Sequence, residues 1–455
     1  MNDELMIHVP GFKAKRPGKI LELCEHLSPV MNEIHRKNYS TRFWTTLLKY
    51  YATTCVNREG LLSGELMDTK PFLLPINAWE LPTRQQVKEK NILYLGKVFL
   101  KNSGLEKVHQ ILKNHENICL GPRGKELADY GIGAFCPTHY PLLIKGDRTP
   151  RRKLLKIAGR VDSIFMRNVI MQIPKFYVEF FEKVHQKIKV FNPEKKVFHA
   201  EHIPLFMELL VALYVENGSK FYNYQLGGFI GETKTSLSPV KYRTIDKHRT
   251  YGWKIHEKDE PHFAYRLESF KKTYQKANPG FLASILLCYN SINAKNKKRY
   301  ADLSRFFFNN INTQKYSRIL LRPRGVSRKM DNSKQLAFLQ TPKFVQVDKG
   351  MKPMAEITKG AEIVVHWNHP STNFLECVFV DHPVVAILTN DEPTEIIKPY
   401  YAFFLEQKVM HKNIESLLDH LNQTDIPGWW ARLTQMPEYK EFKNKFARPL
   451  PVKNY

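Results

Sequence analysis

The stretch from Glu362 to Leu388 combines polar groups that could bind and activate a phosphorylated substrate. Two histidines, His366 and His369, precede a run of hydroxyl and amide side chains at Ser371, Thr372 and Asn373. Hydroxyls and the free N–H groups at a helix start bind anions, and a histidine can accept the proton of a hydroxyl. The stretch therefore predicts a phosphate or nucleotide site. The alternative is an ordinary strand-to-helix turn with a capping box.

The same stretch has the pattern of strand, turn, helix and strand. The β-branched run Ile363 to Val365 predicts a buried strand, and His366 to Pro370 predicts a polar turn. One of the three polar residues would cap a helix over Phe374 to Phe379, whose positive end suits Glu376. Val384 to Leu388 predicts the next buried strand. This is one βαβ unit of a parallel sheet, and such sheets bind ligands beyond the carboxyl ends of their strands.

Two other predicted strands end in residues that suit anions. Lys220 to Tyr224 predicts a strand that continues into a glycine turn, where backbone N–H groups can approach a ligand closely. Ser317 to Leu321 predicts a strand that continues into two arginines, whose guanidinium groups suit a diphosphate. The residues concerned are Gln225, Gly227, Gly228, Arg322 and Arg324. A tight turn without a ligand and a surface arginine pair are the respective alternatives.

Strands alternate with helices in both halves of the chain. This alternation predicts an α/β protein with two Rossmann-like parallel-sheet domains that face a cleft. The first domain, with a helical arm, would cover residues 1–255 and the second residues 256–428. Residues 429–455 would form a C-terminal helix and tail that cross back to the first domain. We expect a mobile loop over residues 233–247 and a charged connecting segment over residues 255–278.

The composition favours a large, basic protein. A chain of 455 residues predicts two or three domains, and its net charge of +26 favours nucleic acid, anionic membrane surfaces or phosphorylated substrates as partners. Six scattered cysteines without metal-binding spacing suit reduced thiols in the cytoplasm. The N-terminus lacks the apolar core of a signal peptide, and no apolar run is long enough to span a bilayer. The sequence contains no recognisable nucleic-acid-binding motif, so nucleic acid is the second choice.

Six short segments occur here in the order in which one family carries them. They are Tyr39–Trp44 (YSTRFW), Tyr94–Gly96 (YLG), Gln225–Gly231 (QLGGFIG), Tyr251–Trp253 (YGW), Ser371–Glu376 (STNFLE) and Trp429–Trp430 (WW). With these segments the chain resembles the GT-B glycosyltransferases. More narrowly, it is similar to transferases from bacterial surface-carbohydrate clusters of the leptospiral lipopolysaccharide-locus type.

The resemblance implies that the second domain binds the nucleotide of an activated sugar and that the first binds the acceptor. The donor phosphate or diphosphate would lie near Arg322, Arg324, Ser371 and Thr372. Glu376 would face the ribose or structure the turn, and Gln225, Gly227, Gly228 and Asn373 would complete the donor site.

One position departs from the family pattern. The histidine of the family's "QHGG" turn is replaced by Leu226. If that histidine were the catalytic base, another residue would have to replace it. The candidates are Glu232, His366 and His369.

These observations predict a glycosyltransferase that builds a surface polysaccharide or lipopolysaccharide from a nucleotide-sugar. No Asp-x-Asp occurs in the sequence, so we expect transfer without a metal or another cofactor. The acceptor would be a saccharide or a lipid-linked saccharide, and the enzyme would be cytoplasmic and peripheral to the inner membrane. The alternatives are a nucleic-acid- or anionic-surface-binding protein with a degenerate transferase fold, and a polyol-phosphate transferase or sugar-nucleotide epimerase on the same scaffold.

Overall fold

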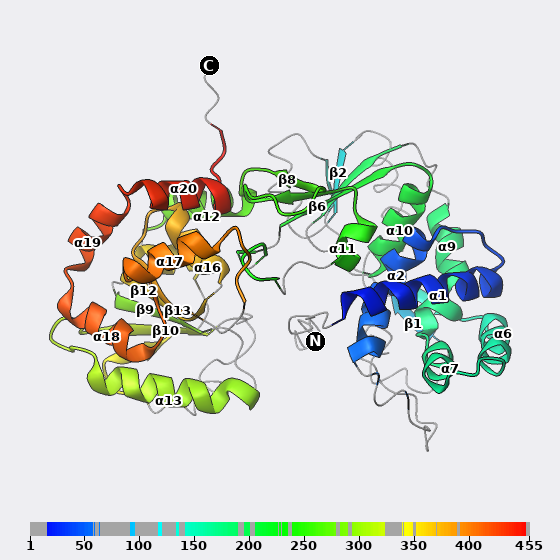
Figure 1. Ribbon diagram of the computed structural model, residues 1–455, viewed down its shortest axis with the longest axis horizontal. Coiled ribbons are helices and arrows are strands. Elements are labelled where there is room, and N and C mark those ends of the chain that lie inside the picture. Colours follow the sequence, from blue (N-terminus) through cyan, green and yellow to red (C-terminus); the bar gives the residue numbers. More distant parts are fainter. Residues whose placement is uncertain are drawn as a thin grey trace. The chain divides into compact units, whose positions relative to one another are not determined.

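The structure, a computed structural model, describes most of the chain in two compact units. The described residues are 16–57, 59, 63, 92–95, 117–120, 133–135, 142–189, 195–200, 205–225, 227–228, 230–234, 239–278, 283–289, 294–323, 339, 341–348, 352–369, 371–388 and 392–451. The first unit consists of Met1–Tyr224 and Ser238–His248, and the second of Gln225–Leu237 and Arg249–Tyr455 (Figure 1). The domain limits predicted at residues 255 and 428 stay a prediction.

The second unit contains a six-stranded sheet whose order is β11-β10-β9-β12-β13-β14. In chain order the strands are β9 (Ala283–Tyr289), β10 (Ile319–Pro323), β11 (Val345–Val347), β12 (Ala361–His369), β13 (Val384–Leu388) and β14 (Met410–His411). Every neighbouring pair is parallel. The chain starts at β9, adds β10 and β11 on one side, and then adds β12 to β14 on the other. The direction of winding therefore reverses between β9 and β12.

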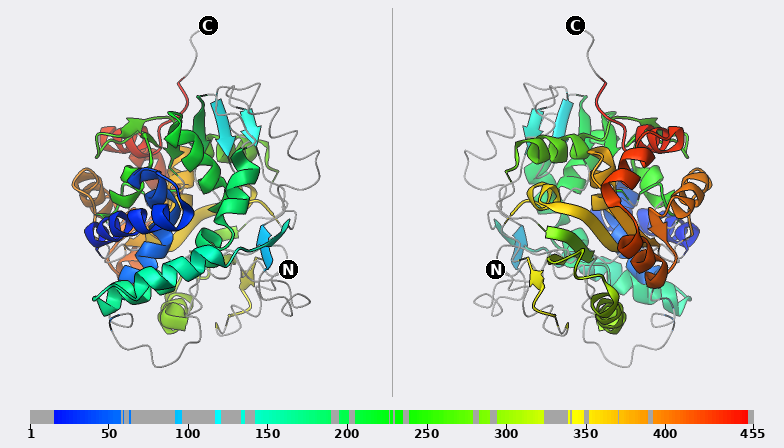
Figure 2. Two further views of the ribbon diagram at one scale, coloured as in Figure 1. Left: turned by 90° about the vertical axis from the view of Figure 1, so that its right-hand side faces the viewer. Right: turned by 90° about the vertical axis from the view of Figure 1, so that its left-hand side faces the viewer.

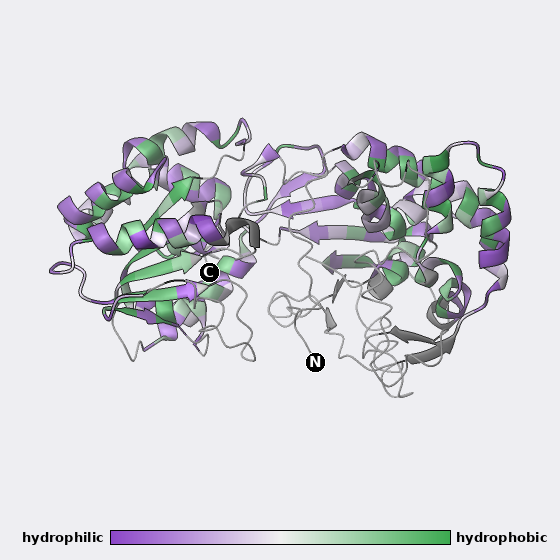
Figure 3. Ribbon diagram, turned by 90° about the horizontal axis from the view of Figure 1, so that it is seen from below, coloured by the Kyte–Doolittle hydropathy of each residue, from purple (hydrophilic) through white to green (hydrophobic). Residues whose placement is uncertain are grey.

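Helices cover both faces of this sheet (Figures 1 and 2). They are α12 (Tyr265–Lys276), α13 (Ala294–Asn310), α15 (Met354–Lys359), α16 (Thr372–Phe379), α17 (Lys398–Glu406), α18 (Ile414–Gln423), α19 (Ile426–Leu433) and α20 (Pro437–Phe446). The strands between them are largely apolar (Figure 3), as strands covered on both faces must be.

Two local predictions for this unit are wrong. Residues 255–278 are not merely a connection, because they contain α12, which buries Leu267 and Phe270. The predicted turn at His366 to Pro370 begins too early, because β12 continues to His369. A register shift between His366 and His369 lets β12 pair with β13 beyond the apolar run, and no local sequence pattern signals that shift.

The C-terminal helices pack on α16 and the residues after it. The Trp430 indole N–H donates to the Asp381 carbonyl at 2.8 Å, and the Tyr439 hydroxyl donates to the Val378 carbonyl at 3.1 Å. After α20, the Arg448 N–H donates to the Tyr251 carbonyl at 2.9 Å. Residues of the second unit thus hold α19, α20 and Arg448 in place.

The other six-stranded sheet has the order β3-β2-β5-β6-β7-β8. Its strands are β2 (Asn117–Leu120), β3 (Gly133–Phe135), β5 (Val197–Ala200), β6 (Lys220–Tyr224), β7 (Lys247–Thr250) and β8 (Asp259–Pro261). The pairs β2–β3, β2–β5 and β5–β6 are parallel, whereas β1 (Ile92–Leu95) and β4 (Leu142–Lys145) form a separate antiparallel pair. The predicted α/β class with two parallel sheets is confirmed.

Helices supply most of the described core of the first unit. They are α1 (Pro17–His35), α2 (Thr41–Asn57), α6 (Thr149–Ala158), α7 (Ile164–Met171), α8 (Lys175–Val178), α9 (Phe181–Lys189), α10 (Leu205–Glu216) and α11 (Pro239–Thr244). The predicted loop at residues 233–247 is wrong in part, because α11 lies within it and buries Val240 and Tyr242. No helix among the described residues combines the length and apolarity needed to cross a membrane.

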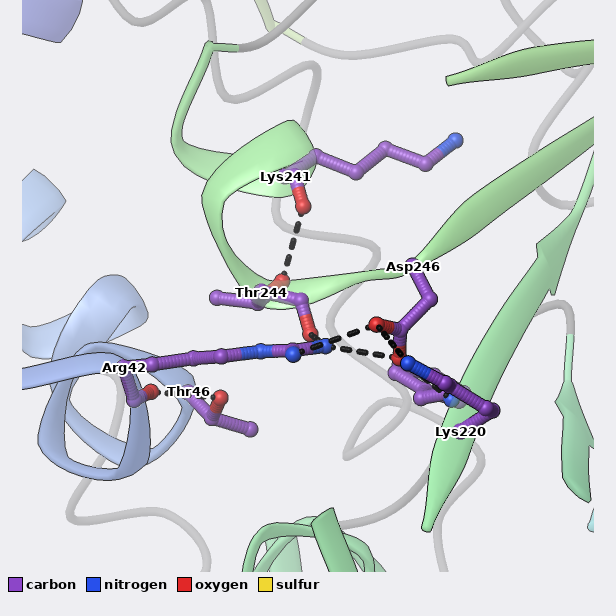
Figure 4. A network of polar contacts seen from close by, with 7 residues as sticks. Arg42, Thr46, Lys220, Lys241, Thr244 and Asp246 are labelled. Carbon is purple, nitrogen blue, oxygen red and sulfur yellow. Dashed lines mark hydrogen bonds and ion pairs between the residues drawn. The ribbon is translucent and has the colours of Figure 1, made fainter. Parts of the chain in front are cut away.

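A polar network fastens α2 to the segment after α11 (Figure 4). The Arg42 guanidinium donates to both carboxylate oxygens of Asp246, at 3.2 and 2.8 Å, and to the Thr244 carbonyl at 3.2 Å. The Asp246 carboxylate also accepts the Phe221 N–H at 2.8 Å. Arg42 belongs to the YSTRFW segment, so this segment has a clear structural role.

Candidate active site

Three side chains lie in one row across the carboxyl ends of β10, β9 and β12. Cys288 on β9 pairs in register with Arg322 on β10 and with His366 on β12. The row lies where the direction of winding reverses, between β9 and β12. In open parallel sheets ligands bind beyond the strand ends at such a reversal. Arg322 and His366 were predicted from the sequence, whereas Cys288 gave no signal beyond being one of six cysteines.

Helix α16 begins directly beyond this row without a side-chain cap. Ser371 occupies the N-cap position with extended backbone angles, φ −143° and ψ 139°, and its hydroxyl makes no capping hydrogen bond. The first N–H groups of a helix have no partner within the helix, so this start can accept an anion. Ser371 and Thr372 are half-buried.

Asn373 and Glu376 are held by protein partners. The Asn373 side-chain N–H donates to Glu376 Oε2 at 3.0 Å. The Cys288 thiol donates to Asn373 Oδ1 at 3.7 Å. Arg266 Nε lies 4.0 Å from Glu376 Oε1. Glu376 is buried, so the carboxylate structures this corner; contact with a ribose stays a prediction.

His366 is kept neutral by its surroundings. Burial and the neighbouring His369 lower the pKa of His366 to about 3, against a smaller opposing effect of a hydrogen bond with Asn373. Its Nε2 has no hydrogen-bond partner among the described residues. Burying an imidazole nitrogen without a hydrogen-bond partner lowers the stability of the fold, so this atom is a candidate contact for a ligand.

The glycine turn belongs to the second unit, and Gln225 organises it. The Gln225 side-chain N–H group donates to the carbonyls of Gly227 and Ile230 at 2.8 and 3.2 Å. Its carbonyl oxygen accepts the Tyr251 N–H and the Trp253 indole N–H, both at 2.8 Å. The predicted QLGGFIG and YGW segments are therefore joined through one buried amide.

The turn touches the start of α16 through Gly228. The Gly228 N–H donates to Thr372 Oγ1 at 3.2 Å. A Cβ atom at Gly228 would lie 2.9 Å from Leu375 Cδ1 and 3.1 Å from the Ser371 carbonyl oxygen. Glycine is therefore required here by the closeness of α16.

Glu232 and His369, two predicted catalytic candidates, meet in the interior. Their Oε2 and Nε2 atoms lie 2.9 Å apart, and neither side chain is exposed. Neither ring nitrogen of His369 makes a hydrogen bond with a described residue, whereas the Tyr401 hydroxyl does donate to Glu232 Oε2, at 3.0 Å. Backbone contacts also hold this point, because the Thr394 N–H donates to the Glu232 carbonyl at 2.9 Å. Tyr401 was missed because nothing in the sequence links α17 to the glycine turn.

Arg322 is already paired within the protein. Its guanidinium contacts the Asp348 carboxylate and donates to the Lys352 carbonyl at 3.3 Å. A phosphate would therefore have to share Arg322 with Asp348. Arg324 and Leu226 lie outside the described residues.

The model of one protein family matches residues 147–452, which is more than half of the chain. This family is described as the LIC12162 family transferases. The chain belongs to this family. The predicted membership of a transferase family is thus confirmed, and with it the prediction of an enzyme.

Solved structures give weaker matches to this LIC12162 family transferase. The wall teichoic acid polymerase TagF is 10% identical, with a TM-score of 0.30 over 58% of this chain and 80% of that chain. A trehalose-phosphate synthase from Burkholderia vietnamiensis is 8% identical, with a TM-score of 0.40 over 73% and 96%. A mutant O-GlcNAc transferase from Thermobaculum terrenum is 11% identical, with a TM-score of 0.37 over 95% and 80%. Comparison with curated proteins gives no match.

The family match includes every candidate residue named above. Among the described residues, the candidates gather around the connection from β12 to α16. His366 and the Glu232–His369 pair lie at the end of β12. Ser371 to Glu376 and Gly228 lie at the start of α16. Within the same described part of the chain, no group of three or more His, Cys, Asp or Glu side chains could hold a metal ion.

Proposed function

We propose that this LIC12162 family transferase is a GT-B-type glycosyltransferase that uses a nucleotide-sugar and needs no metal. Its acceptor would be a surface polysaccharide or lipopolysaccharide. The observation that carries the proposal is the uncapped start of α16 at the reversal between β9 and β12. A helix start in this position suits the phosphate of a nucleotide.

The chemistry of sugar transfer fits these groups. The departing nucleotide phosphate gains negative charge, which helix N–H groups and the hydroxyls of Ser371 and Thr372 can stabilise. These groups would serve in place of a metal ion held by Asp-x-Asp, a motif absent from the sequence. Arg322 would add a positive charge if the donor diphosphate competes with Asp348.

The acceptor hydroxyl also needs a proton acceptor. His369 would take this proton, and Glu232 beside it would stabilise the resulting imidazolium. Both side chains are fully buried, so a role as base requires the glycine turn to open towards the acceptor. A positioning role, in which the pair only fastens the turn, requires no opening. His366 remains the other candidate.

Nucleotide binding tests the proposal directly. Thermal unfolding is measured with CMP, CDP, UDP, GDP and dTDP, with and without EDTA. A ligand at ~100 times its dissociation constant stabilises the folded state by about 2.7 kcal/mol. We expect one nucleotide to raise the melting temperature, equally with EDTA. A chain that responds to none of them would contradict the proposal, and a response abolished by EDTA would contradict metal independence.

A pair of serine variants locates the site. Ser371→Ala removes a hydroxyl that makes no capping bond, so we expect unchanged stability but about tenfold weaker nucleotide binding. Ser163→Ala is the matched control, because Ser163 does cap α7 by accepting the Met166 N–H. It should lower stability by about 1 kcal/mol and leave nucleotide binding intact. Product analysis then separates glycosyl transfer from polyol-phosphate transfer or epimerisation.

A further inference from the structure

Exposed apolar side chains concentrate on one helix pair of the first unit. Among the described residues six large hydrophobic side chains are at least 40% exposed, and three of them lie on α6 and α7. These are Leu155, Ile164 and Met171, at 45%, 43% and 43% exposure. Ile164 and Met171 are seven residues apart and so share one face of α7.

The same helix pair carries a dense positive charge. The segment Arg148 to Arg160 contains six Lys and Arg residues and no Asp or Glu; Asp147 and Asp162 flank it. Arg151 is used inside the protein, where it pairs with Glu179 at 2.9 Å. The exposed cations of the segment form no ion pair with any described residue, and they are Arg148, Arg152, Lys156 and Arg160.

The charged and apolar groups are fixed relative to each other. Helix α6 buries Pro150, Leu154 and Ala158 at a spacing of four residues, so Arg152 and Leu155 project from the remaining surface. The Arg151 guanidinium donates to the Met171 carbonyl at 3.0 Å, which ties α6 to the end of α7. The two helices lie side by side (Figures 1 and 2).

We propose that this α6–α7 face, made by Arg148, Arg152, Leu155, Lys156, Ile164 and Met171, docks on an anionic lipid bilayer. Each Lys or Arg close to such a surface is attracted by its negative potential. The apolar side chains would enter the boundary between headgroups and acyl chains. Nucleic acid would interact favourably only with the cations, because it has no apolar phase into which the three exposed apolar side chains could insert. The inference goes beyond the proposed reaction and does not depend on it.

Vesicle flotation of the full chain tests the proposal without any substrate. The vesicles are phosphatidylcholine with or without phosphatidylglycerol. Wild type should float only with the anionic vesicles. Arg152→Gln with Lys156→Gln should weaken binding about 25-fold, since each cation contributes about fivefold. Leu155→Ser with Ile164→Ser should weaken it about tenfold at unchanged charge.

Matched controls come from α13 in the second unit. Lys298→Gln with Arg299→Gln removes the same charge from two exposed positions of this basic helix, and Phe306→Ser removes a side chain that is 41% exposed. Both controls should bind vesicles as wild type does. Thermal unfolding checks that all variants fold, and surface substitutions of this kind change stability little.

Three results would overturn the proposal. Wild type fails to float with anionic vesicles; the α13 controls weaken binding as much as the α6–α7 variants; or the apolar pair has no effect. A further case is that the apolar pair has no effect while the protein binds duplex or single-stranded nucleic acid in a salt-dependent way. If only the variant of Arg152 and Lys156 then loses that binding, the face binds nucleic acid. Loss of nucleotide binding in the earlier test would leave the vesicle result unaffected, so the two failures are distinguishable.

Discussion

At the scale of single residues, the buried Gln225 side chain uses all its hydrogen-bonding groups on protein partners. Gln225 uses both ends of its amide on the glycine turn and on Tyr251 and Trp253. A side chain so occupied positions the turn, and its direct contact with a donor stays a prediction. The sequence indicated that Gln225 matters but could not say how, because its partners lie up to 28 residues away.

Tyr401 tests the importance of the Glu232–His369 pair. Tyr401→Phe removes the hydroxyl that donates to the buried Glu232 carboxylate at 3.0 Å, and we expect a loss of about 1.5–3 kcal/mol in unfolding free energy. The control is Tyr400→Phe, which removes a hydrogen bond of 2.5 Å to the exposed Glu441. That change should cost about 0.5–1 kcal/mol. Urea unfolding measures both, and equal losses would mean that the Glu232 carboxylate does not depend on Tyr401.

At the scale of elements, apolar runs predicted the strands of the second sheet well. The runs at Ile363 to Val365 and Val384 to Leu388 are β-branched or aliphatic; the first lies within the buried strand β12, and the second makes up all of β13. The end of β12 and the helix α12 were not predictable in the same way. Both depend on pairing or packing with distant segments, which can override a polar local sequence.

The candidate site was predictable only in part for the same reason. The run Ser371 to Glu376 follows a predicted strand and polar turn, so its place at a helix start could be derived from local sequence. Cys288, Asp348 and Tyr401 reach the site through sheet register or helix packing. A single sequence contains no signal for such contacts.

The contact between the glycine turn and α16 can be tested by adding one methyl group. Gly228→Ala would place Cβ 2.9 Å from Leu375, so we expect a loss of about 1–3 kcal/mol and weaker nucleotide binding. Gly18→Ala is the control, since a Cβ there meets nothing within 4 Å. It lies in α1 and should keep or raise stability by up to about 1 kcal/mol. Thermal and urea unfolding measure both, and a neutral Gly228→Ala would show that the turn does not rest on α16.

At the scale of the whole molecule, buried histidines occur in both units, at positions 35, 185, 199 and 248 of the first and 366, 369, 382, 411 and 420 of the second. Burial lowers the pKa of His382, His411 and His420 to about 4 and, with His369, that of His366 to about 3. All four belong to the second unit. In the first unit burial lowers the pKa of His35 to about 4. The second unit therefore contains four described histidines that bind protons only well below the pH at which a free imidazole does.

The sign of their effect on stability follows from proton binding. In the unfolded chain these histidines have a pKa of about 6.5 and bind protons below that pH, whereas in the folded chain they bind protons only near pH 4 or below. Stability from these histidines is fully present above about pH 6.5 and is lost as the pH falls. At about pH 5 the four histidines together cost the second unit several kcal/mol, which is on the order of the stability of a whole domain.

We therefore expect the second unit to lose stability on acidification. Brief pepsin digestion at about pH 5, followed by mass spectrometry, should give cleavages between residues 249 and 451. His382→Asn should flatten the fall in unfolding free energy between about pH 7 and pH 5 by about 2 kcal/mol, because burial alone lowers the pKa of His382. His26→Asn, which changes an exposed histidine of α1, should leave that fall unchanged. If residues 249–451 resist cleavage at this pH, groups other than the buried histidines decide the acid stability of the second unit.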